Sequence, residues 1–287
     1  MSIFDKSKPT LTYFDLYGRG EAIRMALVHS KTDFEDNRVS GESFAAFKAS
    51  GKCLNGQLPV LEVDGRCLNQ SEAIIRFVGS QTGAYDTSDP FAMWAADAVI
   101  NTCSDLEKNS PKDADGKPLL YKMFGDGPMA EADVAAMKEA RGKYWTTLQA
   151  LLGDKAFFGG AKCGDLNLIL DHWATSLSRV RFSAPTSPRT RRVLCSTWCI
   201  CWPGAESVLV TRWCGRFGAH CRPSIGDFWV SASLHAMERN TKGKEAMANV
   251  YAAHAEALAG NAVMTAWADR ISAEFTEYLA TRGGGTL

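Results

Sequence analysis

The fold is decided by the stretch Thr10-Leu-Thr-Tyr-Phe-Asp-Leu16, which is rich in β-branched and aromatic residues. Two glycines follow in Gly18-Arg-Gly20, and an amphipathic run then extends from Glu21 to His29. β-Branched and aromatic residues favour strands, and glycines interrupt regular structure. The stretch therefore predicts a strand, a glycine turn and a helix, which together open a βα unit.

Two further strands are predicted downstream. Leu58–Val63 and Arg66–Leu68 flank the pair Asp64-Gly65, which is typical of a tight hairpin turn. Pro59, near the start of the first of these strands, indicates either an edge position or a cis peptide bond.

A helix is expected next, from Ser71 to Phe77, with Ser71 as its N-cap and Gly79 as its C-cap. Residues 1–82 therefore predict a small α/β domain.

The rest of the chain predicts a second domain, all helical, over residues 90–282. A turn-rich linker, Gly83–Asp89, precedes it, and Asp89-Pro90 places a capping residue before a proline at the first helical position. Ser224-Ile-Gly-Asp227 has the spacing of a capping box. Helical patterns occupy Phe91 to Leu152 with a long amphipathic stretch at Glu131–Leu151, then Phe228–Met237, Lys242–Leu258 and Ala262–Ala280.

Composition restricts the class of function. The 287 residues are 46% apolar and 22% charged, and Lys plus Arg equals Asp plus Glu at 32 each. A balanced charge gives no sign of a nucleic-acid partner and favours a small molecule. No uncharged apolar run reaches the roughly 18 residues of a membrane helix, and the first ten residues lack a signal-peptide core. With an odd count of nine cysteines, a reduced compartment is favoured, so we expect a soluble cytoplasmic protein.

One segment, residues 163–222, differs from its surroundings. It holds eight Arg, no Lys, three acidic residues, four of the eight Trp and six of the nine Cys, with no apolar period. We interpret it as an atypical insert. Without it, Gly159-Gly-Ala-Lys162 would join Pro223-Ser224-Ile-Gly-Asp227 directly, and the favoured hypothesis is a retained intron or a gene-model error.

Two alternatives remain for the insert. A metal site is suggested by a cluster of possible ligands, although their CxxxC and CxC gaps differ from the paired CxxC of zinc ribbons. That cluster consists of Cys195, Cys199, Cys201, Cys214, His220 and Cys221. The other alternative is a genuine lineage-specific loop, whose arginines would form a basic interaction patch.

Tyr13 is the first candidate for catalysis, because its strand runs into a helix N-terminus. A neutral phenol beside a bound thiol donates a hydrogen bond that favours the thiolate and lowers the thiol pKa. The thiolate is the reactive form of sulfur. The alternative, from position alone, is an aromatic side chain packed in the core.

Three motifs together resemble the cytosolic glutathione transferases of the tyrosine type, nearest the sigma class. These are Tyr13-Phe14 with Gly18-Arg19-Gly20-Glu21-Ala-Ile-Arg24, then Gly56-Gln57-Leu58-Pro59-Val60, then Asn69-Gln70-Ser71-Glu72-Ala73-Ile74. The resemblance covers residues 10–162 and resumes over 223–282. It implies a thioredoxin-like domain that binds glutathione and a helical bundle that supplies the site for a hydrophobic electrophile.

The resemblance also implies roles for single residues. Tyr13 would activate the glutathione sulfur, and Arg19 would support the electrostatics of the site. Pro59 would be the cis-proline that lets the Val60 backbone pair with the tripeptide as an added strand. Gln70 and Ser71 would bind the γ-glutamyl carboxylate at a helix N-terminus. The glutathione-binding set is Phe44, Lys48, Gln57, Leu58, Pro59, Val60, Gln70, Ser71 and Asp105.

Some of these positions have a plainer alternative or depart from the family. Lys48 would pair with the glycine carboxylate of glutathione, or be a solvated charge. Phe44 replaces a tryptophan and has no N–H to donate. Asp105 would reach across a homodimer to the glutathione amino group, or be a surface acid. The helix Asp97–Leu106 and the region around Trp94 would line the electrophile pocket and the dimer interface, or Trp94 would be a plain core residue.

Metal activation is not expected, because Asn101 and Ser104 replace the carboxylates that bind metal in some prostaglandin synthases. Tyr17 stands in place of an arginine that is usual in these enzymes, which argues against a prostaglandin synthase. The function expected is a glutathione transferase with glutathione as co-substrate and no metal. The alternatives are a glutathione-dependent isomerase and a non-catalytic binding or structural module.

Overall fold

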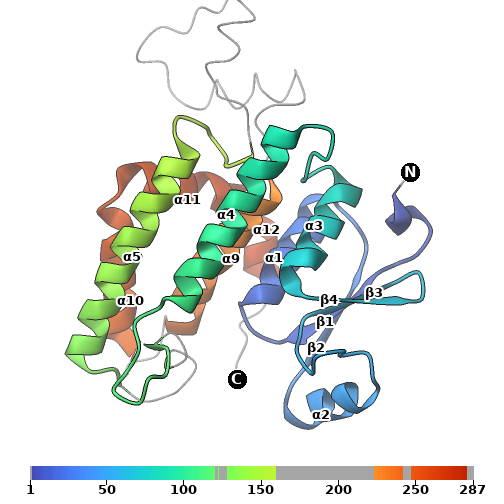
Figure 1. The fold of residues 1–287 in the computed structure, drawn as a ribbon, viewed down its shortest axis with the longest axis horizontal. Coiled ribbons are helices and arrows are strands. Elements are labelled where there is room, and N and C mark those ends of the chain that lie inside the picture. The colour runs from blue at the N-terminus through green and yellow to red at the C-terminus, as the bar shows by residue number, and fades with distance from the viewer. Residues whose placement is uncertain (1, 120–121, 123–127, 160–222, 242–246, 283–287) are drawn as a thin grey trace, which may run out of the picture. The chain divides into compact units, whose positions relative to one another are not determined.

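The computed structural model describes residues 2–119, 122, 128–159, 223–241 and 247–282 (Figure 1). Met1–Gly160 and Arg222–Leu287 form one compact unit. The insert predicted at residues 163–222, with its candidate metal cluster, lies outside the described residues. The limits 1–82 and 90–282 remain the predicted extents of the two domains.

A four-stranded sheet forms the N-terminal half of this unit. Its strands are β1 (Thr10–Phe14), β2 (Glu35–Val39), β3 (Val60–Val63) and β4 (Arg66–Asn69), in the order β2-β1-β3-β4. β1 runs parallel to β2 and antiparallel to β3, and β3 pairs antiparallel with β4. The predicted strand, glycine turn and helix are confirmed, as is the hairpin at Asp64-Gly65, where both residues have positive φ.

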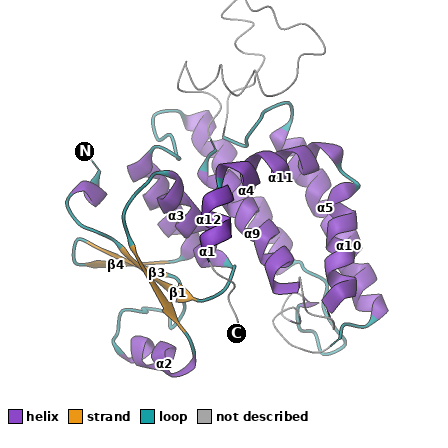
Figure 2. Cartoon of the chain, turned by 180° about the vertical axis from the view of Figure 1, so that it is seen from behind, coloured by secondary structure: helices purple, strands orange, loops and turns teal. Residues whose placement is uncertain are grey.

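Helices α1 (Arg19–His29) and α3 (Ser71–Thr82) lie on one side of the sheet and α2 (Gly41–Ala49) lies on the other (Figures 1 and 2). The sequence prediction that α1 is amphipathic is wrong, since every residue from Gly20 to Leu27 is buried. The reason is tertiary, because α1 packs against β1, α3 and α9 at once. β2 and α2 were not predicted from the sequence.

Helix α3 is longer than expected. The prediction that Ser71 is the N-cap is wrong, because Gln70 is the N-cap and Ser71 the first helical residue, while Gly83 ends the helix in a left-handed conformation with φ +81°. The predicted end at Gly79 is wrong, because that glycine lies inside the helix. A Cβ at Gly79 would lie 2.4 Å from Ile225 Cγ2, so glycine is needed there for the close approach of α9.

The C-terminal half is helical, as expected. Its helices are α4 (Pro90–Lys108), α5 (Glu131–Leu152), α9 (Ile225–Thr241), α10 (Ala248–Ala259), α11 (Ala262–Glu274) and α12 (Thr276–Thr281). Asp89 caps α4 by accepting the Phe91 N–H at 2.8 Å, which confirms the predicted start. The single helix predicted at Ala262–Ala280 is wrong, since it is interrupted at Phe275. The predicted start at Lys242 lies outside the described residues.

The buried carboxylate of Asp227 organises the start of α9. It accepts hydrogen bonds from the N–H of Phe158 at 2.9 Å, the indole of Trp267 at 2.9 Å, and both the N–H and the hydroxyl of Ser224 at 2.8 and 2.9 Å. Burial raises the pKa of this carboxyl, and the four donors oppose that shift. The predicted pairing of Ser224 with Asp227 is confirmed.

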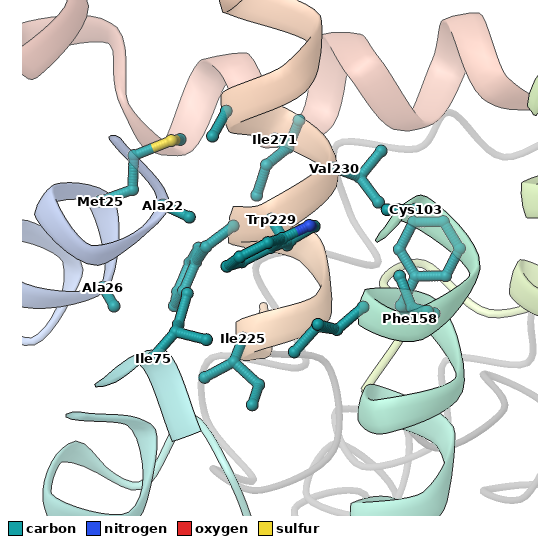
Figure 3. Packing of buried hydrophobic residues seen from close by; sticks show 14 of the residues in the cluster. Ala22, Met25, Ala26, Ile75, Cys103, Phe158, Ile225, Trp229, Val230 and Ile271 are labelled. Carbon is teal, nitrogen blue, oxygen red and sulfur yellow. The ribbon is translucent and has the colours of Figure 1, made fainter. Parts of the chain in front are cut away.

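Helix α9 is the central element of the core. Its residues Ile225 and Trp229 lie between α1, represented by Ala22 and Ala26, and the helical half of the molecule (Figure 3). The two halves therefore share one hydrophobic core. A displacement of α9 would consequently also displace α1, the helix that begins at Arg19.

The prediction that Trp94 is a core residue is wrong, because 65% of its surface is exposed. Phe91, one turn earlier, is 82% exposed. The buried face of α4 instead carries Ala96, Val99, Ile100 and Cys103. At 100° per residue, Trp94 falls outside that face.

Gly79→Ala is expected to lower the free energy of unfolding by about 1–3 kcal/mol, the usual effect of overpacking. Gly142→Ala in α5 is the matched control, because no atom lies within 4 Å of its added Cβ. The control should raise stability by about 0.5–1 kcal/mol, since glycine weakens a helix interior. Urea denaturation measures both, and a Gly79→Ala chain as stable as the parent would contradict the close contact of α3 and α9.

Candidate active site

Tyr13 lies at the end of β1, with its phenol against the first turn of α1. Its side chain is 7% exposed, and its oxygen accepts a hydrogen bond from the Arg19 N–H at 3.1 Å. A Cβ at Gly18 would lie 2.7 Å from the phenol oxygen, and one at Gly20 would lie 2.4 Å from the ring. Both glycines are therefore required for the phenol to reach the helix N-terminus, as the sequence predicts.

Burial raises the pKa of the Tyr13 phenol, although the Arg19 N–H and the charges of Arg19 and Arg24 act in the opposite direction. The phenol is consequently neutral at neutral pH. Because its oxygen already accepts a backbone hydrogen bond, its O–H proton can be donated to a ligand. A buried neutral donor next to a helix N-terminus stabilises an anion placed beside it.

Arg19 extends from α1 to α4. Its guanidinium pairs with Glu107 at 3.2 Å, and its side chain is 56% exposed. The sequence predicted Arg19 but not Glu107, because the residues are 88 positions apart and no local pattern marks the acid. The ion pair of Arg19 and Glu107 thus connects the start of α1 with α4.

A buried ionic network holds the loop between Tyr13 and Arg19. Glu21 and Arg24 have fully buried side chains and pair at 3.1 Å. Arg24 donates to the carbonyls of Phe14 at 3.2 Å and Leu16 at 3.3 Å, and to Asp36 at 2.8 Å. Arg24, in the second turn of α1, therefore holds the loop that follows Tyr13 in place.

The C-terminus completes this network. Arg282, with a buried side chain, donates to both carboxylate oxygens of Glu21 at 2.7 and 2.8 Å and to the Leu16 carbonyl at 3.0 Å. Its guanidinium also lies 3.8 Å from the centre of the Tyr17 ring, and Tyr278 donates to Glu21 at 2.8 Å. Burial alone would lower the pKa of Arg282, but Glu21 outweighs it and raises that pKa. Sequence analysis missed Arg282, Tyr278 and Tyr17 as contributors to the site.

The peptide bond between Leu58 and Pro59 is cis. Of the two alternatives for Pro59, the cis bond is confirmed and the edge strand is wrong, since β3 lies between β1 and β4. Val60 is opposite Thr12 on one side and Asn69 on the other. The expected strand addition at Val60 is therefore wrong, because both flanks are occupied. Leu58 precedes β3 and lies outside the strand.

Gln70 and Ser71 lie at the N-terminus of α3. Ser71 is buried, whereas Gln70 is exposed and has φ +73°, in the left-handed region that favours glycine. A non-glycine residue in this region is strained, and such strain concentrates at functional sites. The free N–H groups of this helix end suit a carboxylate.

Phe44 and Lys48, the predicted site residues of α2, lie on the side of the sheet opposite α1 and α3. The Phe44 ring contacts Phe14 edge-on at 5.0 Å between centroids, and Phe14 contacts Tyr13 at 5.7 Å. Lys48 lies over Gly56, because a Cβ there would be 2.9 Å from Lys48 Cε. Gln57, the residue after Gly56, is exposed.

The structure does not place Asp105 with the other predicted site residues. Its side chain is 72% exposed and lies 3.8 Å from Lys108. Its neighbours bind α3 instead, because Asn101 accepts from Arg76 at 3.3 Å and Ser104 donates to Glu72. Among the described residues, no group of three or more His, Cys, Asp or Glu is arranged to hold a metal ion.

Comparison with known proteins finds a family match in the N-terminal quarter of the chain. Residues 9–80 match the family model for the glutathione S-transferase N-terminal domain. This stretch is therefore similar to the N-terminal domain of glutathione S-transferases. In the described part of the chain, no helix is long and apolar enough to cross a membrane.

Curated relatives extend the match beyond this stretch. The chain is 36% identical over 129 residues to a probable glutathione S-transferase 5 of Caenorhabditis elegans, covering 45% of this chain and 58% of that protein. It is 28% identical over 167 residues to hematopoietic prostaglandin D synthase of Gallus gallus, covering 58% and 78%. The chain thus spans less than two thirds of the nematode relative.

Solved structures share the complete glutathione S-transferase fold. A monomeric glutathione S-transferase of the hookworm Necator americanus has TM-score 0.63 and 19% identity, covering 98% of this chain and all of that one. The enzyme of Ascaris lumbricoides has TM-score 0.61 and 20% identity, covering 96% and 98%. At these identities the likeness establishes the fold, a thioredoxin-like domain followed by a helical domain.

Arg282→Ala is expected to lower the free energy of unfolding by about 3–5 kcal/mol, the usual effect of breaking a buried ion pair. Arg19→Ala is the contrast, because its pair with Glu107 is half-exposed and worth less than about 1 kcal/mol. Chemical denaturation of both variants measures the difference. Equal losses would contradict the role of the buried network.

Proposed function

We propose that this chain is a glutathione transferase in which Tyr13 stabilises the thiolate of glutathione. The observation that carries the proposal is the buried, neutral phenol that accepts the Arg19 N–H and keeps its own proton for a ligand. Each unit by which the thiol pKa falls below its usual value near 8.5 is worth about 1.4 kcal/mol. Much of the rate then comes from a larger thiolate fraction and from proximity.

Glutathione would lie along the ends of the elements that surround Tyr13. We assign the γ-glutamyl carboxylate to the N-terminus of α3, at Gln70 and Ser71, because free N–H groups there attract anions. The glycine carboxylate would pair with Lys48, near Gln57. The backbone of Leu58, in place of Val60, would bind the cysteinyl residue beside the cis bond to Pro59. Phe44 would contribute only apolar contact.

The reaction joins the sulfur of glutathione to an electrophilic carbon of the second substrate. The thiol proton leaves to solvent, the sulfur forms a bond to carbon, and the leaving group departs with the electron pair of its own bond. Tyr13 donates its hydrogen bond to the sulfur anion before attack, and Arg19 adds positive potential that Glu107 moderates. A small hydrophobic electrophile and a cytoplasmic detoxification role of the sigma-class type complete the proposal.

A homodimer is proposed on two features of α4. Asp105 is exposed, away from the site of its own chain, so it is free to approach the glutathione of a second copy. Phe91 and Trp94 leave large apolar surfaces on the same helix. A glutathione-dependent isomerase is the second candidate, since a relative is a prostaglandin D synthase. A non-catalytic glutathione-binding module is the third.

Tyr13→Phe is expected to keep glutathione binding and to lower kcat/KM at neutral pH by at least about tenfold, because the donor to the sulfur is lost. Tyr85→Phe is the matched control, since it removes another buried phenol oxygen, one bound to Asp97 at 3.1 Å. The assay is conjugation of glutathione to a generic aromatic electrophile.

An unchanged rate for Tyr13→Phe would remove this residue from the mechanism. Glutathione binding by the parent chain without turnover of any electrophile would favour the non-catalytic module. Loss of activity in Tyr85→Phe as well would assign the effect to stability.

A further inference from the structure

A cavity of about 360 Å³ lies between α4, α5 and α9. Its apolar wall comes from Ala136, Met137, Ala140 and Tyr144 of α5, and Ser233 contributes from α9. Its charged residues are Glu107, Glu139, Arg141 and Lys143. The cavity therefore offers an apolar surface with a charged rim.

The two acids of the cavity are already neutralised. Glu107 pairs with Arg19 at 3.2 Å, and Glu139 pairs with Lys143 at 2.6 Å. Arg141, in contrast, pairs with no carboxylate among the residues that the structure describes. Arg141 is consequently the lining cation whose charge no carboxylate of the described residues offsets.

Arg141 is held in place by two weak contacts. Its Nη1 lies 3.5 Å from the Ser233 hydroxyl, to which it donates, and its guanidinium lies 5.1 Å from the centre of the Tyr144 ring. These contacts fix the side chain without using up its donors. A guanidinium has five N–H donors in a planar fork that matches a carboxylate, so most of this capacity remains for a ligand.

Glu107 and Arg19 link the cavity to Tyr13. Glu107 lines the cavity and binds the Arg19 side chain, while the Arg19 N–H binds the Tyr13 phenol. Two residues thus connect the cavity with the phenol.

We propose that Arg141 is a specificity residue that binds the carboxylate of an amphipathic, acidic electrophile. This inference rests on the proposed glutathione transferase function and deepens it. The apolar body of the substrate would lie on Met137, Ala140 and the Tyr144 ring, with its carboxylate on the Arg141 guanidinium. The substrate class is accordingly electrophiles that carry a carboxylate, such as unsaturated ketones of organic acids.

Addition to such a ketone balances without another reagent. The thiolate sulfur bonds to the β-carbon, and the electron pair of the C=C bond moves to the carbonyl oxygen as an enolate. The enolate then takes a proton from water, while the thiol proton has left to solvent. The carboxylate on Arg141 takes no part in the bond changes, so Arg141 acts on binding.

The test compares ethacrynic acid, an unsaturated ketone with a carboxylate, with its methyl ester. The full chain should have a higher kcat/KM for the acid than for the ester by about 10- to 100-fold, the range for a charge-assisted hydrogen bond. In Arg141→Gln this ratio should fall to near one, mainly through KM for the acid. Arg141→Lys should restore part of it, because the charge returns without the fork.

Lys138→Gln is the matched control, since it removes a cation from the same helix that pairs with Glu256 outside the cavity. This variant should have the same ratio of kcat/KM values, acid over ester, as the parent chain. A ratio near one in the parent chain, or an unchanged ratio in Arg141→Gln, would overturn the proposal.

If no electrophile is turned over, the proposed function fails, and calorimetry with dihydroethacrynic acid and its methyl ester decides the cavity separately. These saturated compounds cannot react with a thiol. Tighter binding of the acid that is lost in Arg141→Gln would support the carboxylate site. Equal dissociation constants for the acid and ester, or no loss in the variant, would overturn it.

Discussion

The buried carboxylate of Glu21 is the constraint on which the rest of the site depends. Removing a charge from water costs free energy. This cost is offset only when hydrogen bonds and opposite charges surround the buried group. Arg24, Arg282 and Tyr278 supply them. Tyr278 lies in α12 and Arg282 directly follows that helix, so these contacts to Glu21 require residues 276–282 to pack on the first βα unit.

This docking determines where the Tyr13 phenol lies. The carbonyl of Leu16 receives donors from both Arg24 and Arg282, which holds the loop that turns from β1 into α1. The same turn brings the Arg19 N–H to the phenol oxygen. A side chain more than 260 positions away therefore helps to set the geometry of the residue that would activate sulfur. Asp227 is likewise a buried carboxylate that holds an element in place, here the start of α9, which packs against α1.

Local patterns in the sequence predict much of this. The glycines around Arg19, the Asp64-Gly65 turn and the pairing of Ser224 with Asp227 depend on neighbours in the chain, and all three are found in the structure. β2 escaped prediction because Glu35–Val39 is largely polar and becomes a strand only by pairing with β1.

Long-range contacts account for the remaining errors. Gly79 resembles a helix end in the sequence, but it is an interior residue that lets α9 approach. Trp94 resembles a core residue, but the smaller side chains of α4 form the buried face. Glu107, Arg141 and Arg282 carry no local signal, because their roles arise from elements far apart in the chain.

Titrating the ultraviolet absorbance of the thiolate in the binary complex tests whether Tyr13 keeps bound glutathione ionised. The pKa of the bound thiol is expected to lie about two units or more below the usual thiol value near 8.5, with no ionisation of Tyr13 in that range. A bound thiol that titrates like free glutathione would contradict this expectation.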